Sequence, residues 1–153
     1  MPSIFPYGRS TSSGVSIITI AAGHYGIAIK MINGTGAASV KGTLVSASKT
    51  EDGKFVLQAN EFDTIGIVSE SGMADGAECL VTISGVAEVL WKDSNTATRG
   101  YVAIAADTDG RAVNVDVPTS NPVVAEHFKE IGHVLESKGS GTNVLVRCIL
   151  HFN

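Results

Sequence analysis

An internal repeat limits the folds open to this chain more than any other property of its sequence. Residues 41–56 read KGTLVSASKTEDGKFV, and residues 99–113 read RGYVAIAADTDGRAV. Each stretch begins with a basic residue and Gly, continues through an apolar run, turns at Asp-Gly, and restarts with a basic residue. Because Asp-Gly is a favoured pair for tight turns between strands, each stretch predicts a β-hairpin.

A second pair of echoed stretches follows the first in the same order. Residues 65–81, IGIVSESGMADGAECLV, and residues 131–146, IGHVLESKGSGTNVLV, share Ile-Gly-x-Val-x-Glu-Ser, a Gly turn and a later Leu-Val. Turn residues and apolar strands are what recurs, and this is typical of a scaffold. The recurring Glu70 and Glu136 are therefore predicted to tie down their loops by hydrogen bonds rather than to act as acids.

Short β-branched runs separated by turn residues predict an all-β fold. We expect a compact sandwich or barrel with an internal duplication, whose echoed units cover about 40–90 and 98–152. Residues 1–14 are rich in Pro, Ser and Gly, and predict an extended N-terminal arm ahead of a single β-domain over 15–153. Gly85 is expected to separate off a further strand, VAEVLW.

The second copy carries about nine extra residues, which fall in VPTSNPVVAEHFKE, residues 117–130. Two prolines occur early in this segment, and residues 124–130 predict a short helix of one or two turns. An insertion into one copy breaks the symmetry of the scaffold. Loops of this kind often carry contacts with other molecules.

The chain has 153 residues, of which 44% are hydrophobic and only 17% are charged. An ordinary soluble domain has roughly 25% charged residues, so a monomer of this composition would be poorly protected against self-association. We therefore expect partners or further copies of the chain to cover much of the surface. The net charge of −4 and the lack of a Lys/Arg cluster argue against a nucleic-acid partner. No apolar stretch approaches the roughly 20 residues of a membrane span.

Four histidines and two cysteines raise the question of a metal site. His127 and His133 are close in sequence, and His151 follows soon after Cys148. Zinc needs three or four converging ligands, whereas an odd separation on a regular strand places Cys148 and His151 on opposite faces. We therefore expect no metal and no cofactor. Cys79 and Cys148 are interpreted as small buried hydrophobic residues.

Motifs that carry catalysis are not found in the sequence. The chain has no Gly-x-Ser-x-Gly elbow around a nucleophile and no Gly-rich phosphate loop ahead of a helix. The stretch that starts at Asp107 lacks the later oxygen ligands of a calcium loop, and a tight turn explains it fully. Trp91 fits a core position better than a sugar-binding cleft. We therefore expect no catalytic residues and no enzymatic activity.

Six short strings carry a resemblance to a known family over about the last ninety residues. They are SGVAEVLW (84–91), ATRGYV (97–102), DGRA (109–112), HFKEIGH (127–133), GTNVL (141–145) and LHFN (150–153). These strings resemble those of bacteriophage and prophage capsid decoration (cement) proteins or related head proteins. They are structural strings, so they indicate kinship more than mechanism.

The resemblance implies a virion structural protein that binds the outer surface of a phage head and reinforces contacts between major capsid subunits. It also implies assembly with further copies of the chain, as a homotrimer, after synthesis in the cytoplasm of the bacterial host. The family supplies no catalytic residues. A receptor- or carbohydrate-binding module displayed on the particle is the alternative, and a small hydrolase ranks behind both.

Our hypothesis for the contact surface combines the N-terminal arm with the inserted loop. Both segments carry apolar or aromatic side chains among polar residues, and such side chains need to be buried somewhere. For the arm, the sequence leaves open whether they pack on their own domain or dock onto a neighbouring molecule. The candidate capsid- or partner-contact residues are Ile4, Phe5, Tyr7, Arg9, Val123, His127 and Phe128. Deletion of residues 1–12 is expected to abolish binding to particles while the β-domain stays folded.

Overall fold

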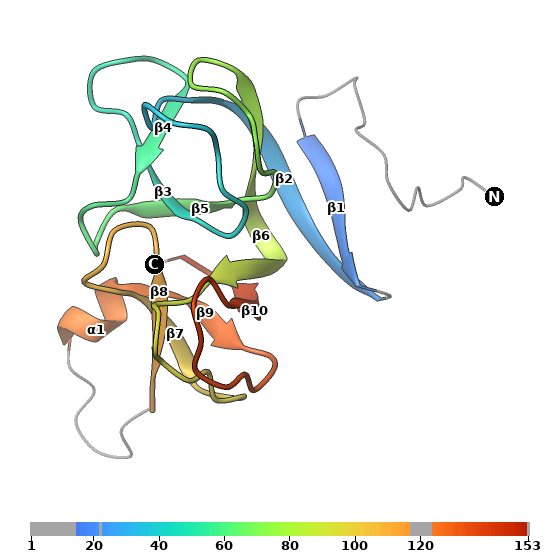
Figure 1. Cartoon of the computed structure of the whole chain (residues 1–153), viewed down its shortest axis with the longest axis vertical. Helices are drawn as coiled ribbons and strands as arrows, with labels where there is room; N and C mark the ends of the chain where they lie inside the picture. Colours follow the sequence, from blue (N-terminus) through green and yellow to red (C-terminus); the bar gives the residue numbers. More distant parts are fainter. Residues whose placement is uncertain (1–14, 22, 117–123, 153) are drawn as a thin grey trace.

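The computed structural model describes residues 15–21, 23–116 and 124–152, and these residues are mostly β-sheet (Figure 1). Within them, ten strands form one continuous sheet and the only helix is short. The all-β class is thereby confirmed. No helix in these ranges is long and apolar enough to cross a membrane. The arm predicted over residues 1–14 lies outside the described residues.

Most strands are short, but β6 is 13 residues long. In chain order the elements are β1 (Val15–Ala21), β2 (His24–Asn33), β3 (Leu44–Ala47), β4 (Lys54–Leu57), β5 (Thr64–Val68), β6 (Glu78–Leu90), β7 (Val102–Ala105), β8 (Ala112–Val115), α1 (Val124–Phe128), β9 (Glu130–Val134) and β10 (Leu145–Leu150). The helix α1 lies in the insertion, within the predicted stretch 124–130, so the short helix is confirmed.

The first half of the chain closes into a small barrel. Its strands are ordered β2-β4-β3-β5-β6, and β2 pairs in addition with the first part of β6, which closes the ring. The pairings are antiparallel except between β2 and β4, where Asn33 lies beside Phe55 in a short parallel bridge. We name β2–β5 with residues 78–84 of β6 the first barrel. β1 lies at the edge of the sheet, paired with β2.

The second half of the chain repeats this arrangement. Residues 85–90 of β6 pair with β10, and β9, β7 and β8 follow in the sheet. Trp91, directly after β6, forms a parallel bridge with Ala112 in β8 and closes the second ring. We name these strands the second barrel. The two barrels share β6 and lie one above the other in Figure 1.

The internal duplication is confirmed by individual hydrogen bonds as well as by strand order. In the first barrel the N–H of Gly42 donates to the carbonyl of Val68 at 2.8 Å. In the second barrel the N–H of Gly100 donates to the carbonyl of Val134 at 2.9 Å. A bulge also occurs at the same place in both barrels, where β3 meets β5 and where β7 meets β9.

One part of the sequence echo does not match the structure. Val81 pairs with Val68, but Val134, the counterpart of Val68, pairs with Cys148 rather than with Val146. The last strand is therefore shifted by two residues relative to the echoed Leu-Val. A shift of two keeps each side chain on its face of the strand, because successive side chains alternate. Val81, Val146 and Cys148 are accordingly all buried.

Gly85 is a bend inside β6, not the break between strands that the sequence predicts. Its φ is +79°, and a Cβ at this position would lie 2.6 Å from the carbonyl oxygen of Tyr25. Glycine adopts this conformation at no steric cost, whereas other residues rarely do. The strand can therefore continue without interruption from the first barrel into the second.

The apolar core has two clusters, one for each barrel. The first-barrel cluster consists of Val45, Phe55, Val68, Cys79 and Val81. The second-barrel cluster is larger and includes Trp91 and Ala112, together with Leu44 and Ile67 from the first barrel. The closing bridges also differ: Phe55 faces the smaller Asn33 in one barrel, and Trp91 faces the smaller Ala112 in the other. Each bridge thus combines a large ring with a small partner, as close packing requires.

Candidate interaction surface

The inserted loop places part of the predicted contact surface on the outside of the molecule. Phe128 and Val124 in α1 are 56% and 69% exposed, and His127 is exposed as well. The rings of His127 and Phe128 lie 6.0 Å apart. The remaining candidates lie outside the described residues: Ile4, Phe5, Tyr7, Arg9 and Val123.

Lys129 fixes the end of this helix to the first barrel. Its ammonium group forms an ion pair with Glu61 and lies 5.4 Å from the centroid of the Phe62 ring. Glu61 and Phe62 belong to the loop between β4 and β5, and Phe62 is itself exposed. The insertion of the second barrel therefore brings Val124 and Phe128 to a part of the first barrel that also exposes an aromatic ring.

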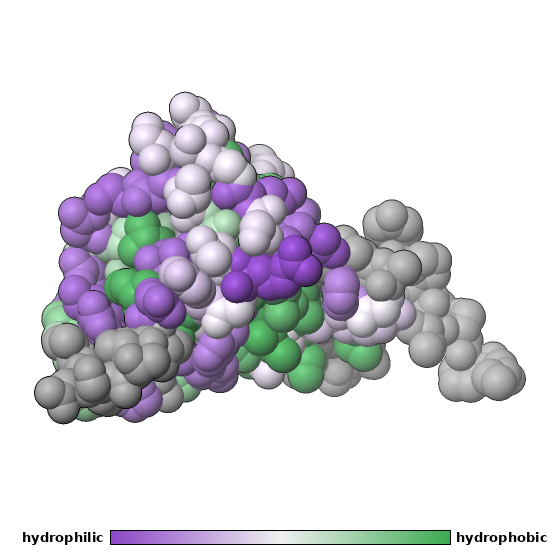
Figure 2. Space-filling view, turned by 90° about the horizontal axis from the view of Figure 1, so that it is seen from below, coloured by the Kyte–Doolittle hydropathy of each residue, from purple (hydrophilic) through white to green (hydrophobic). Residues whose placement is uncertain are grey.

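The β1–β2 hairpin exposes a second apolar surface, which the sequence analysis missed as a contact site. Ile17 pairs directly with Ile27, and the two side chains are 60% and 45% exposed. Tyr25 shares their face of the hairpin, because it lies two residues from Ile27, and it is also exposed. Figure 2, a view from below, shows a group of apolar side chains on the underside of the molecule. We name Ile17, Tyr25 and Ile27 the hairpin strip.

The sequence of β1 does not predict this exposure. The run VSIITI is apolar at most positions, so it does not indicate which face is buried. Ser16 is buried while its neighbour Ile17 points outward, although isoleucine is usually buried and serine usually exposed. In the described part of the chain, β1 pairs along one edge, with β2. An exposed apolar edge strand is a ready surface for contact with another chain.

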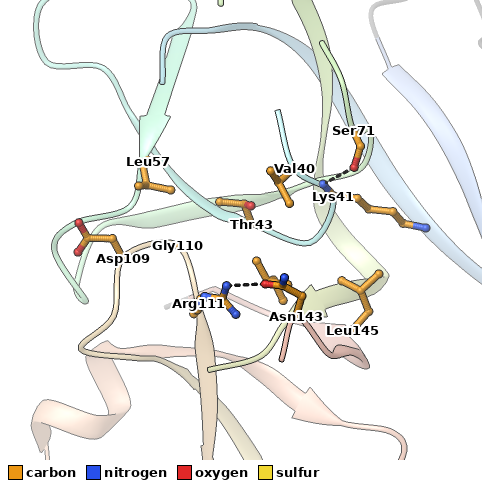
Figure 3. A pocket seen from close by; sticks show the side chains of 11 residues that line it. Val40, Lys41, Thr43, Leu57, Ser71, Asp109, Gly110, Arg111, Asn143 and Leu145 are labelled. Atoms are coloured by element: carbon orange, nitrogen blue, oxygen red, sulfur yellow. Dashed lines mark hydrogen bonds between the residues drawn. The ribbon is translucent and has the colours of Figure 1, made fainter. Parts of the chain in front are cut away.

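A pocket of about 550 Å³ lies in the seam between the two barrels (Figure 3). Both barrels contribute to its wall. The lining residues are Val40, Lys41, Thr43, Leu57, Ser71, Leu90, Asp109, Gly110, Arg111, Asn143 and Leu145.

Several polar groups around this pocket form hydrogen bonds within the protein. Arg111 donates to the side-chain oxygen of Asn143 at 2.7 Å and to the carbonyl of Trp91 at 2.8 Å. The N–H of Leu44 in the first barrel donates to the carbonyl of Gly110 in the second at 2.9 Å. The bond from Leu44 to Gly110 joins the two barrels, whereas the two bonds of Arg111 lie within the second barrel. Because a main-chain bond crosses between the barrels here, we interpret the pocket as a structural seam.

The recurring glutamates tie their loops to the main chain, which confirms their predicted role. The Glu70 carboxylate accepts the N–H of Leu80 at 3.0 Å, and the Glu136 carboxylate accepts the N–H of Arg147 at 3.0 Å. Leu80 and Arg147 occupy equivalent positions in the two barrels. The echo of Glu in the sequence therefore reflects a repeated structural bond.

The serine after each glutamate has a repeated role as well. Ser71 Oγ accepts the N–H of Lys41 at 2.8 Å, and Ser137 Oγ accepts the N–H of Arg99 at 3.1 Å. Each bond joins the loop after β5 or β9 to the basic residue that precedes β3 or β7. The polar residues shared by the two copies thus hold loops whose backbone groups would otherwise need other partners.

Glu136 also forms an ion pair with the side chain of Arg147. Its Oε2 accepts from Nε at 3.0 Å and from Nη2 at 2.7 Å. Burial raises the pKa of Glu136, but the hydrogen bonds from Arg147 and the charges of Lys138 and Arg147 outweigh it. The pKa of this carboxyl therefore lies below its ordinary value.

The two cysteines are core residues, as the sequence predicts. Cys79 and Cys148 are buried and unbridged. Burial raises the pKa of Cys148 to about 12, so the thiol stays protonated near neutral pH and is a poor nucleophile. Cys148 is buried, whereas His151, directly after the end of β10, is exposed. His151 instead contacts His133, with 2.8 Å between Nε2 and Nδ1.

Comparison with known proteins assigns no family to this chain. No protein-family model matches it, and no curated protein sequence matches it significantly. The resemblance of the short strings and the exposed surfaces of the structure are therefore the features that point to a function.

Proposed function

We propose that this protein is a capsid decoration (cement) protein, which binds the outside of a phage head with the major capsid protein as its partner. The observation that carries the proposal is the hairpin strip, an isoleucine pair and a tyrosine exposed on an edge hairpin. Contiguous apolar surface on a soluble protein commonly marks a contact site. The resemblance of the C-terminal strings to head proteins supplies the kind of partner.

Two separate apolar surfaces suit a protein that reinforces contacts between subunits. The hairpin strip is one, and the exposed Phe62, Val124 and Phe128 around α1 are the other. Burial of apolar surface contributes roughly 25 cal/mol per Å², so each small contact is weak alone. Once one contact has formed, the next becomes intramolecular, and retention on the particle rises strongly. Assembly as a homotrimer would multiply these contacts further and belongs to the same proposal.

Quantitative mass spectrometry of purified virions tests the proposal directly. The expected result is a copy number comparable to that of the major capsid protein. A handful of copies would move the chain to a vertex, neck or fibre. Absence from the particles would exclude a structural role and reopen the enzymatic alternative.

Serine substitutions in the hairpin strip test the surface itself. Ile17→Ser combined with Ile27→Ser should weaken binding to heads that lack the protein by roughly tenfold or more, because two interface isoleucines contribute more than about 1.4 kcal/mol. Cosedimentation with capsids measures the loss. Val40→Ser, which removes an exposed apolar side chain from the loop before β3, is the matched control and should bind like the wild type. Equal binding by the hairpin variant would exclude the strip as a contact surface.

The role of the N-terminal arm is tested in the same assay. Deletion of residues 1–12 should abolish cosedimentation, while circular dichroism shows an intact β-domain. Full binding by the shortened chain would remove the arm from the contact surface and leave the hairpin strip and α1.

A further inference from the structure

Three histidines surround one carboxylate beside the second barrel. Glu130 Oε1 lies 3.2 Å from His151 Nε2 and 3.9 Å from His133 Nδ1, and these two ring nitrogens are 2.8 Å apart. The other carboxylate oxygen, Oε2, lies 3.4 Å from His127 Nδ1. The Glu130 side chain is 12% exposed, whereas those of His133 and His151 are 42% and 45% exposed. We name these four residues the histidine cluster.

A bulge in β9 produces the cluster. On a regular strand Glu130 and His133 would point to opposite faces, because their separation is odd. The pairing of β9 with β7 passes from Glu130 directly to Gly132 and leaves Ile131 without a partner in the ladder. Such an extra residue re-aims the side chains beside it. Reasoning from regular spacing therefore missed the cluster, and it did not consider Glu130 as a ligand at all.

The first barrel has no equivalent of this cluster, although it has the same bulge. The residues in the places of Glu130, His133 and His151 are Thr64, Ile67 and Ser84, respectively. His127 has no counterpart, because it lies in the insertion. The scaffold therefore folds without these groups, and the cluster is an addition of the second barrel. Polar groups that a duplicated scaffold does not need point to a separate role.

We propose that the histidine cluster binds a divalent transition metal such as zinc, with Glu130 Oε1, His133 Nδ1 and His151 Nε2 as ligands. Zinc prefers imidazole nitrogen and carboxylate oxygen, at about 2.0–2.2 Å from the ion. Donor atoms around a tetrahedral ion at these distances lie roughly 3.3 Å apart. The three observed separations lie on either side of this value. The fourth position is left to water or to a donor from another molecule.

His127 is a positioning residue in this site. Its contact with Oε2 orients the carboxylate while Oε1 faces the other two histidines. Contacts that orient a metal ligand without touching the metal typically contribute about 10- to 100-fold to the affinity of the site.

Titration of the tag-free full chain with zinc chloride, after removal of bound metal by a chelator, tests the proposal. Calorimetry should show one zinc ion per chain, and zinc should raise the Tm, because it binds the folded state. His133→Gln and His151→Gln should each weaken binding at least tenfold and remove the rise in Tm, and His127→Gln should weaken binding roughly tenfold. The Tm of these variants without zinc should stay close to that of the wild type, because none of the three histidine side chains is buried in the core.

His24→Gln is the matched control, since His24 is the remaining one of the four histidines and lies against Arg147. This variant should keep the stoichiometry and affinity of the wild type. The proposal is overturned if the wild type binds no zinc, which would leave the cluster as a hydrogen-bonded network. It is equally overturned if the cluster variants bind as tightly as the wild type, or if His24→Gln loses as much affinity as they do.

Discussion

At the scale of single residues, the two barrels share a backbone bond but differ in the charge around it. Glu70 and Glu136 both accept a main-chain N–H, and Glu136 holds in addition the guanidinium of Arg147. The counterpart of Arg147 in the first barrel is the apolar Leu80. Arg147 also lies 3.2 Å from His24 Nδ1, so it connects β10 with the start of β2. The ionised Glu136 therefore stabilises the second barrel locally.

This contact predicts a dependence of stability on pH. Because the pKa of Glu136 is lower in the folded chain than its ordinary value of 4.5, the carboxylate stabilises the fold above pH 4.5, and this contribution is lost as the pH falls through the folded pKa. Glu136→Gln should therefore lower the free energy of unfolding by about 0.5–1 kcal/mol at pH 7. The difference should vanish in acid below the folded pKa, as measured by urea unfolding.

The matched control is Glu51→Gln, which removes an ion pair with Lys54 on an exposed turn. It should have a smaller effect at pH 7, because exposed pairs contribute little. If Glu136→Gln lowers the free energy of unfolding by the same amount at pH 7 and in acid, the charge of Glu136 does not stabilise the fold.

At the scale of elements, β6 belongs to both barrels. Its first part pairs with β2 and β5, and its second part pairs with β10. The change occurs at Gly85, where the backbone bends with positive φ. The helix α1 depends on contacts with distant residues, since five residues are too few for a stable isolated helix. Its flanking residue Lys129 contacts the loop between β4 and β5.

The bend in β6 predicts that Gly85→Ala destabilises the fold by about 1–3 kcal/mol. The added Cβ would lie 2.6 Å from the carbonyl oxygen of Tyr25, and main-chain atoms cannot move aside as a flexible side chain can. Gly139→Ala is the control, because a Cβ there meets nothing within 4 Å. Denaturant unfolding followed by circular dichroism compares the two. Similar stabilities for both variants would contradict the tight bend at Gly85.

At the scale of the whole molecule, the two barrels form one body. Leu44 and Ile67 of the first barrel belong to the core cluster of the second. The seam is closed by main-chain bonds in both directions, from Leu44 to Gly110 and from Leu90 to Gly42. With β6 shared as well, neither barrel can lose its structure without exposing core residues of the other.

We therefore expect both barrels to unfold in a single transition. Trp91 is the only tryptophan and is buried in the second-barrel cluster, while Cys79 is buried in the first-barrel cluster. In the variant Cys148→Ala, thiol labelling reports on the first barrel and tryptophan fluorescence reports on the second. Coincident midpoints in urea are the expected result. Two separate midpoints would show that the barrels unfold independently.

Local patterns in the sequence were sufficient for the fold class and for much of the scaffold. Alternation, turn residues and recurrence predicted the strands, the short helix and the duplication, because these features depend on neighbouring residues. The same patterns predicted the bonding role of Glu70 and Glu136 and the burial of both cysteines. Two predictions from these patterns were wrong. Gly85 is a bend within one strand rather than a break between two strands, and the echoed Leu-Val pairs do not occupy equivalent positions in the two barrels.

Contacts between distant residues settled the rest. Closure of each ring requires bridges between remote strands, such as Trp91 with Ala112, and no local pattern encodes them. The exposure of Ile17 depends on which face of β1 meets the body, and the run VSIITI reads the same on both faces. The meeting of Glu130, His133 and His151 depends on a bulge that reverses the alternation of side chains and on a strand that follows later in the chain. Sequence spacing assumes regular strands, and here the backbone departs from regularity where the side chains converge.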